Sequence, residues 1–224
     1  MHARLISYSQ TDQRWPTQDL AGLYNVSDLI AFCARVSNPS NQANTKTTKR
    51  LLEYLIKHKH WSPFEMASCC VEVTTTRDIA RQLLRHRSFS FQEFSQRYAD
   101  VSSLDKSFVT REARLQDSTN RQNSIPTDDQ RLQMIWTSHQ NKVLSYAKEA
   151  YEWAIENGIA KEQARVVLPE GLTLSRLYVN GTIRSWIHYL ELRTANGTQK
   201  EHMDLARVIA SAIKEIYPLI LDEK

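Results

Sequence analysis

Glycine is scarce in this chain, with five among 224 residues, and no two of the five have the spacing of a phosphate-binding loop. Walker loops and dinucleotide fingerprints need closely spaced glycines, because backbone N–H groups must approach the phosphate. The spacing therefore excludes both of these nucleotide sites. If the protein binds a nucleotide, side chains and helix N-termini must hold the phosphates.

Cysteine and long apolar stretches are also scarce. The three cysteines, Cys33, Cys69 and Cys70, follow no spacing typical of a metal or redox site, so we expect buried thiols in a reducing compartment. The longest clearly apolar stretch, residues 29–34, is far too short to span a bilayer. The first residues lack the apolar core of a secretory signal. We therefore expect a cytoplasmic protein without a membrane partner.

An excess of charge is missing as well. The chain has 29 positive and 25 negative side chains, a net charge of +4, which is too weak to indicate nucleic-acid binding by itself. Apolar residues make up 41% and charged residues 24%, which is ordinary for a globular protein. A chain of this length can bury roughly 70% of its unfolded surface. We expect one domain over residues 1–224.

Helical patterns outnumber strand patterns, and the two do not alternate regularly, which predicts a helix-rich α+β fold around a small central β-sheet. Residues 99–126 are polar and are expected to form a long loop. Thr127 with Gln130 predicts a capping box, and Thr182 predicts a second helix cap. The expected strands are 3–9, 66–75 and 172–179, and the expected helices are 27–35, 48–58, 76–87, 127–157, 161–168, 182–193 and 199–216.

Residues 77–98 contain five arginines and no lysine. Arg77, Arg81 and Arg85 recur every four residues and are expected to line one side of a helix. Like charges at this spacing repel each other, and a bound anion would relieve the repulsion. Arginine grips phosphate and imide edges with two parallel hydrogen bonds, which favours an anion site over the alternative of a basic solvated face.

The same segment continues with Phe89, Phe91 and Phe94 among hydroxyl side chains, a pattern that offers ring-stacking surfaces beside hydrogen-bonding groups. One alternative is a single-stranded nucleic-acid platform on these rings. Another is phosphoryl transfer through His86, which lies between two arginines. Both alternatives leave the segment functional but assign it different ligands.

Two further segments are rich in functional side chains. His58 and His60 could ligate a metal, but no third ligand stands at a metal-site spacing, so we predict no metal. Arg184 and His188 are four residues apart and share a helix face. Arg193 lies near the end of that helix, where a cation complements the helix dipole, and this alone is a sufficient structural reason for it.

Taken together, these segments resemble the flavin-dependent thymidylate synthase family. Arg85-His86-Arg87, followed by seven residues and Ser95, matches the signature pattern of that family. Further matching segments follow in the same order between residues 34 and 193. These are residues 34–37, 58–65, 82, 93, 95–98, 164–169 and 184–193.

The resemblance implies a homotetramer that binds FAD, with each active site built from several subunits. It implies methylation of dUMP at C5 to dTMP, with 5,10-methylenetetrahydrofolate as carbon donor, NADPH as reductant and tetrahydrofolate as product. The residues implied for FAD are Ser62, Arg85, His86, Arg87, Glu93, Thr182, Arg184 and His188. The residues implied for dUMP are Gln82, Arg85, Glu93, Ser95, Gln96, Arg97, Arg165 and Arg193.

By the same resemblance, Arg193 lies on the uracil edge and is the expected catalytic residue. Methylation at C5 needs electron density at that carbon, which the other thymidylate synthase family provides by adding a cysteine thiolate to C6. No cysteine lies in the three functional segments, but a guanidinium at the N3/O4 edge can stabilise the developing negative charge instead. Ser95 is expected to donate a hydrogen bond, because a serine nucleophile needs a positioned base. The flavin supplies the hydride.

Overall fold

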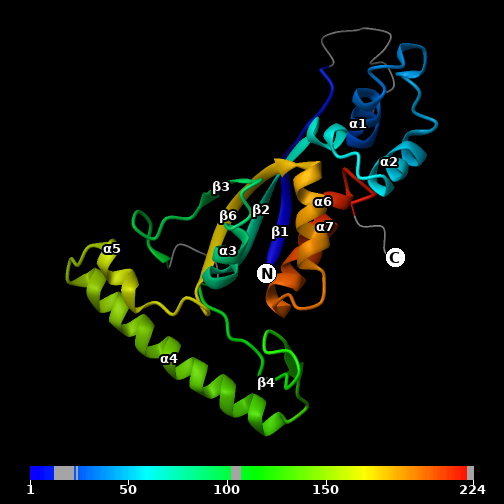
Figure 1. The fold of residues 1–224 in the computed structure, drawn as a ribbon. Helices are drawn as coiled ribbons and strands as arrows, with labels where there is room; N and C mark the ends of the chain where they lie inside the picture. Colours follow the sequence, from blue (N-terminus) through cyan, green and yellow to red (C-terminus); the bar gives the residue numbers. More distant parts are fainter. Residues whose placement is uncertain (13–22, 24, 102–106, 221–224) are drawn as a thin grey trace.

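The computed structural model describes residues 1–12, 23, 25–101 and 107–220 (Figure 1). Its centre is a four-stranded antiparallel sheet in which the strands lie in the order β1, β2, β6, β3. The fold is α+β, helix-rich around a small sheet, as expected. The strands of this sheet are β1 (His2–Tyr8), β2 (Ser68–Thr76), β3 (Ser90–Glu93) and β6 (Leu174–Thr182).

Helices α3, α6 and α7 pack against one face of the sheet, and the predicted helices are present with shifted ends. In Figure 1, α6 and α7 run beside the sheet while α4 extends away from it. Within the described ranges, no helix is long and apolar enough to cross a membrane. The helices are α1 (Val26–Ala34), α2 (Thr48–Lys57), α3 (Arg77–Leu83), α4 (Gln130–Glu156), α5 (Lys161–Ala164), α6 (Ile183–Arg193) and α7 (Lys200–Lys214), with 3-10 turns at Pro39–Asn41, Ser62–Glu65 and Arg165–Val167.

The strand β6 shows why one face of the sheet is buried. Leu177 and Val179 are fully buried, whereas Arg176, Tyr178 and Asn180 between and beside them are exposed. Side chains two apart on a strand share a face, so this alternation puts one face against the core and the other outside. The buried face joins residues of α3, α6 and α7 in one apolar core.

The strands β2 and β6 pair over their whole length, from Ser68 opposite Thr182 to Thr76 opposite Leu174. This register places the start of α3, which follows β2, beside the start of β6. It also places the start of α6, which follows β6, beside the start of β2. The two helices that carry most of the predicted site residues are therefore positioned by a single strand pair.

Of the two predicted helix caps, one differs from the structure and one agrees with it. The helix expected from residue 27 begins at Val26, and the side chain of Asn25 caps it by accepting a hydrogen bond from the Asp28 N–H at 2.9 Å. Asp129, not Thr127, caps α4 through the N–H of Leu132, at 3.0 Å. In both helices the capping residue directly precedes the first helical residue, so its side chain lies close to the free N–H groups of the first turn. The Thr182 cap of α6 is confirmed.

The helix expected over residues 76–87 is shorter in the structure. The helix α3 ends at Leu83, and the N–H of His86 then bonds the carbonyl of Leu83 in a turn. The chain must leave the helix here because Phe89 is drawn into the core, where it is 8% exposed and packs 4.4 Å from the Trp186 ring. The strand β3 follows this turn and was not predicted from the sequence.

Residues 99–126, expected as a loop, contain a short two-stranded hairpin of β4 (Arg114–Gln116) and β5 (Ser124–Pro126). Each strand is only three residues long, too short for a visible alternation. The hairpin is fastened to the rest of the protein by an ion pair between Arg114 and Glu201 of α7, both of which are nearly buried.

Candidate active site

Most of the predicted site residues gather at three places in the described chain, and Arg85 and Arg87 lie on a separate turn. One is a cluster in which His86 and Arg193 meet, which we call the histidine cluster (Gln82, His86, Tyr189, Arg193 and His202). The second is an arginine-lined cleft beside α5. The third is a group at the start of α6, formed with residues 61–65.

In the histidine cluster, Arg193 ends α6 and its Nε donates a hydrogen bond to Nε2 of His86 at 3.0 Å. Burial, together with the positive charges of Arg193 and Arg85, lowers the pKa of His86 to about 4. The imidazole is therefore neutral near pH 7 and can accept this bond. The two Nη groups of Arg193 form no hydrogen bond with any described residue, so a ligand can use them.

The cluster is completed by three further residues next to the Arg193–His86 pair, namely Gln82, Tyr189 and His202. The His202 side chain is fully buried and lies within hydrogen-bonding distance of both Gln82 and Tyr189. The His86 ring is 5.0 Å from the Tyr189 ring and 6.4 Å from the His202 ring. The sequence analysis predicted Gln82, His86 and Arg193 as site residues but did not predict Tyr189 or His202.

The second place is a cleft of about 360 Å³, which we call the arginine cleft. Three arginines are among its lining residues, Arg77, Arg81 and Arg165. Arg77 and Arg81 thus join Arg165 and not Arg85, because α3 ends before Arg85. The residues that line the cleft are Arg77, Arg81, Gln96, Glu162, Arg165, Val166, Leu168 and Glu170.

The charges of the arginine cleft are only partly compensated. Arg77 pairs with Glu93 at 3.4 Å, and Arg81 pairs with Glu170. Burial, opposed by Glu93 and reinforced by Arg81 and Arg165, lowers the pKa of Arg77. An anion entering the cleft would add the missing negative charge, and guanidinium groups suit phosphate.

Gln96 gives independent evidence for a ligand in this cleft. Its side chain is 3% exposed, yet its Nε2 has no hydrogen-bond partner among the described residues. A buried donor without a partner is costly and calls for an explanation. An acceptor on a bound ligand provides one. Glu93 lies nearby in the same contact network, where it accepts from the Ser175 hydroxyl at 2.8 Å.

Ser95 and Arg97 lie on the surface next to Gln96. Arg97 pairs with Glu162 at 3.5 Å, and both side chains are more than half exposed. This pair contributes little to stability, since exposed ion pairs are weak. Arg97 is therefore free to exchange Glu162 for a phosphate.

The third place is the start of α6. Arg184 pairs with Glu65, and the His188 ring packs edge-on against the Trp61 ring at 4.5 Å. Ser62 lies exposed in the adjoining 3-10 turn. The predicted helix face shared by Arg184 and His188 therefore lies along residues 61–65, the other segment that the sequence singled out.

Arg85 and Arg87 follow α3 and are exposed. Neither forms an ion pair within the described residues. Arg85 is near enough to His86 and Arg193 to lower the pKa of both. Two cations without an ion-pair partner on one short turn can together bind a polyanionic ligand such as a diphosphate.

The aromatic platform that the nucleic-acid alternative needs is not formed. Phe89 is buried against Trp186, and Phe91 packs against the same core. A ring buried in this way cannot stack on a base. The alternative of phosphoryl transfer is also disfavoured, because the Nε2 lone pair of His86 already accepts from Arg193.

No metal site is found in the part of the chain that the structure describes, where no three His, Cys, Asp or Glu side chains come together. His58 and His60 instead pack around Tyr54, with ring distances of 4.2 and 6.3 Å.

The three cysteines are free, and none of them lines the arginine cleft. Cys69 is buried in β2 as expected, whereas Cys33 and Cys70 are only half-buried, contrary to the expectation. Burial raises the pKa of Cys69 to about 12, so its thiol stays protonated and is a poor nucleophile.

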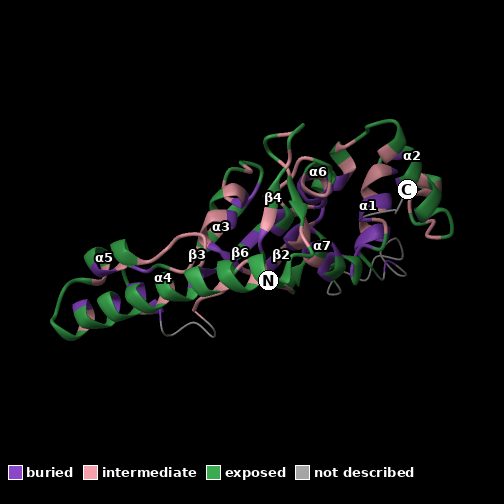
Figure 2. Cartoon of the chain, turned by 90° about the horizontal axis from the view of Figure 1, so that it is seen from below, coloured by how far each residue is buried: buried purple, intermediate pink, exposed green. Residues whose placement is uncertain are grey.

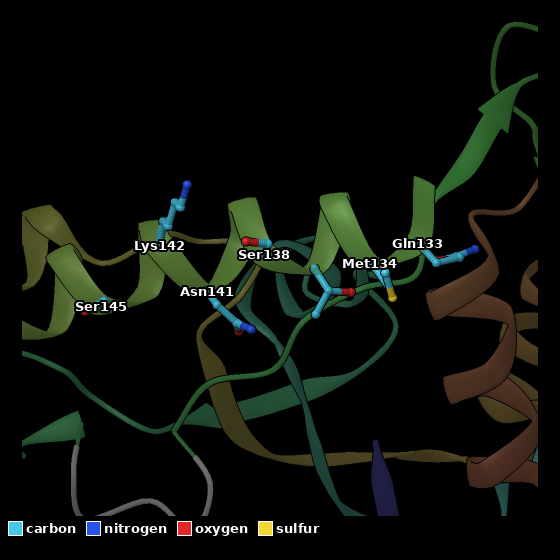
Figure 3. A pocket seen from close by; sticks show the side chains of 7 residues that line it. Gln133, Met134, Ser138, Asn141, Lys142 and Ser145 are labelled. Carbon is cyan, nitrogen blue, oxygen red and sulfur yellow. The ribbon is translucent and has the colours of Figure 1, made fainter. Parts of the chain in front are cut away.

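A larger pocket of about 620 Å³ lies along α4 (Figure 3). Lys142 is its one charged lining residue, and no arginine, histidine or carboxylate faces it. In Figure 3, Lys142 points away from Asn141 and Met134. We therefore do not place the chemistry here. The lining residues are Gln133, Met134, Thr137, Ser138, Asn141, Lys142 and Ser145.

Comparison with known proteins gives one consistent result. A family profile described as "Thymidylate synthase complementing protein" matches residues 18–219. A probable flavin-dependent thymidylate synthase of Paramecium bursaria Chlorella virus 1 is 50% identical over 217 residues, which cover 97% of this chain and 94% of the relative. The flavin-dependent thymidylate synthase of a Synechocystis species is 47% identical over 192 residues, 86% of each chain.

Among solved structures, a similar one is a UMP/dUMP methylase, PolB, from Streptomyces cacaoi, bound with 5-Br dUMP. It superposes with a TM-score of 0.78 at 26% identity and covers 97% of this chain and 91% of that chain.

Proposed function

Because this chain belongs to the flavin-dependent thymidylate synthase family, we propose that it converts dUMP to dTMP by reductive methylation at C5. In this reaction 5,10-methylenetetrahydrofolate is the carbon donor and tetrahydrofolate the product. FAD, when bound, supplies the hydride that it has received from NADPH. The protein itself binds the substrates, orients them and provides charge.

The Arg193–His86 hydrogen bond is the observation that supports this mechanism most directly. Neutral His86 holds the guanidinium through Nε and leaves the Nη groups for the N3/O4 edge of uracil. A fixed cation at that edge stabilises the negative charge that develops on the pyrimidine as C5 becomes nucleophilic. Arg193 can therefore act without a cysteine thiolate, and it is the proposed catalytic residue.

The residues for the nucleotide and the flavin fit their ligands chemically. The arginine cleft, with Gln96 and Arg165 and with Ser95, Arg97 and Glu93 beside it, suits the phosphate and sugar of dUMP. The unpaired Arg85 and Arg87 suit the diphosphate of FAD. The remaining residues proposed to contact FAD are Ser62, His86, Glu93, Thr182, Arg184 and His188, and the remaining ones for dUMP are Gln82 and Arg85.

The site is proposed to be completed between subunits of a homotetramer. No hydrogen bond or ion pair among the described residues links the arginine cleft to the histidine cluster of the same chain. Most of α4 is exposed (Figure 2), and it carries more large apolar side chains on its surface than a solvated helix needs. A second copy of the chain would cover them. They are Leu132, Met134, Ile135, Trp136, Val143, Tyr146 and Trp153.

Sedimentation tests this assembly. A tetramer is expected for the wild type. Val143 is 52% exposed on α4, and Val143→Glu, which puts a charge among the exposed apolar side chains of that helix, should dissociate the tetramer. A wild-type monomer that is fully active would contradict the proposal.

We also propose that residues 1–224 are one domain. The cytoplasmic location remains a prediction, supported by the three free cysteines.

The activity is tested first with flavin. The protein is incubated with FAD, desalted, and its visible spectrum is recorded anaerobically before and after NADPH and dUMP are added. A retained flavin spectrum that bleaches with NADPH, followed by dTMP formation when the folate is added, is expected. A folded protein that retains no flavin would contradict the proposed function.

The role of Arg193 is tested by Arg193→Ala in the flavin-loaded protein. The loss of a preorganised charge at the reacting pyrimidine should lower dTMP formation at least about a hundredfold while FAD remains bound. Arg207→Ala is the matched control, because Arg207 is an exposed arginine on α7 that pairs with Asp204. Normal turnover by Arg193→Ala would refute the assigned role.

A further inference from the structure

His202 is a buried histidine that the reaction described above does not use. It lies in the first turn of α7 with no exposed surface. Its Nδ1 is 3.1 Å from Oε1 of Gln82 and its Nε2 is 3.2 Å from the Tyr189 hydroxyl. A neutral imidazole has one donor and one acceptor nitrogen, so the two contacts must have opposite directions.

The carboxylate of Glu201 determines those directions. An ionised carboxylate only accepts, so the Gln199 group that lies 2.9 Å from Glu201 must be the amide nitrogen. The oxygen of Gln199 then faces Gln82 and accepts from the Gln82 amide nitrogen at 2.8 Å. The Gln82 oxygen is left to face His202.

The direction passes from Gln82 to Tyr189 through the imidazole. Because the Gln82 oxygen can only accept, Nδ1 of His202 must carry the proton, and Nε2 must accept from the Tyr189 hydroxyl. Burial raises the pKa of Tyr189, so its hydroxyl keeps the proton that it donates. The chain of bonds therefore has one consistent polarity from Tyr189 to Glu201, and Arg114 anchors Glu201 at the far end.

We propose that His202 is a positioning residue for the nucleotide substrate, because its Nδ1–H holds the amide oxygen of Gln82 and so determines how Gln82 presents its remaining donor and acceptor to the pyrimidine. This proposal rests on the proposed function, in which Gln82 contacts dUMP. After both bonds of the chain are made, the Gln82 amide retains one N–H and one oxygen lone pair. A pyrimidine edge of alternating donor and acceptor groups matches that pair.

Two substitutions separate this role from simple packing. The amide nitrogen of asparagine lies close to the position of Nδ1, so His202→Asn retains a donor for the Gln82 oxygen. The longer glutamine places its amide near the position of Nε2, so His202→Gln retains a partner for Tyr189 and loses the donor to Gln82. Both variants bury one amide at the same position.

The expected result is a difference in KM. In the flavin-loaded protein, His202→Gln should raise the KM for dUMP about tenfold, which corresponds to about 1.4 kcal/mol, with kcat little changed. His202→Asn should stay near the wild-type KM. In a Gln82→Ala background, His202→Gln should have no further effect, because the group that it positions is gone.

Equal KM values for the two His202 variants would overturn the proposal, and so would an additive effect with Gln82→Ala. If the wild type itself forms no dTMP, the proposed function fails, and this result is distinct from equal variants of an active enzyme. Should a variant not fold, ¹⁵N-histidine NMR of the wild type decides. A His202 imidazole with its proton on Nδ1 is expected, and a proton on Nε2 would overturn the proposal.

Discussion

The pH dependence of stability should carry a contribution from His202. Burial, reinforced by the positive charge of Arg193 and by His86 when it is protonated, lowers the pKa of His202 to about 3 in the folded protein. In the unfolded chain the pKa is about 6.5. Between these two values the unfolded state binds a proton at His202 and the folded state does not. The contribution of neutral His202 to the free energy of unfolding is therefore fully present above about pH 6.5. It is lost progressively as the pH is lowered toward 3.

The size of this effect follows from the two pKa values. Each pH unit in that interval is worth about 1.4 kcal/mol for one group. At pH 5.0 the loss is about 2 kcal/mol, and at pH 7.5 it is close to zero. No discount for solvent screening is needed, since the His202 side chain is fully buried. The variant His202→Asn cannot titrate and should lack this loss.

The assay is urea unfolding of the wild type and His202→Asn at pH 7.5 and 5.0, at one protomer concentration. His86, whose pKa is also lowered, is present in both proteins, so its contribution largely cancels in the comparison. The free energy of unfolding of the wild type should fall about 2 kcal/mol more than that of the variant. Parallel changes in the two proteins would refute the reasoning that His202 is buried and neutral.

Two other predictions concern positions outside the histidine cluster. Cys69→Ala with Cys70→Ala should keep kcat for dTMP formation, because Cys69 is a buried protonated thiol. A folded, flavin-bound double variant without turnover would show that a thiol is needed. Gly181→Ala should lower the free energy of unfolding by about 2 kcal/mol, since its new Cβ would lie 2.3 Å from the buried Phe89 ring; an unchanged thermal midpoint would contradict this.

Much of the candidate site was predicted from the sequence because its signals are local. The arginine-rich segment, the cap at Thr182 and the four-residue spacing of Arg184 and His188 all depend on neighbours within a few residues. The alternation in β6 was visible for the same reason. The family signature at residues 85–95 is likewise a short, continuous pattern.

The errors occurred where a distant contact outweighs local propensity. Helix periodicity favoured a continuation of α3 to Arg87, but the burial of Phe89 against Trp186, almost a hundred residues later, ends the helix at Leu83. The short hairpin β4–β5 was missed because its attachment is the Arg114–Glu201 ion pair. Local patterns contain no information about such partners.

The sequence alone identified the α+β class and most of the principal elements, and it predicted a set of candidate functional side chains, since burial periodicity and residue chemistry are properties of short segments. The grouping of those side chains required the tertiary structure. Arg77 meets Arg165, and Gln82 meets His202, 120 residues away, because the β2–β6 register and the packing of α7 on the sheet bring distant segments together. Such contacts follow from the packing of the whole chain, and no single segment encodes them.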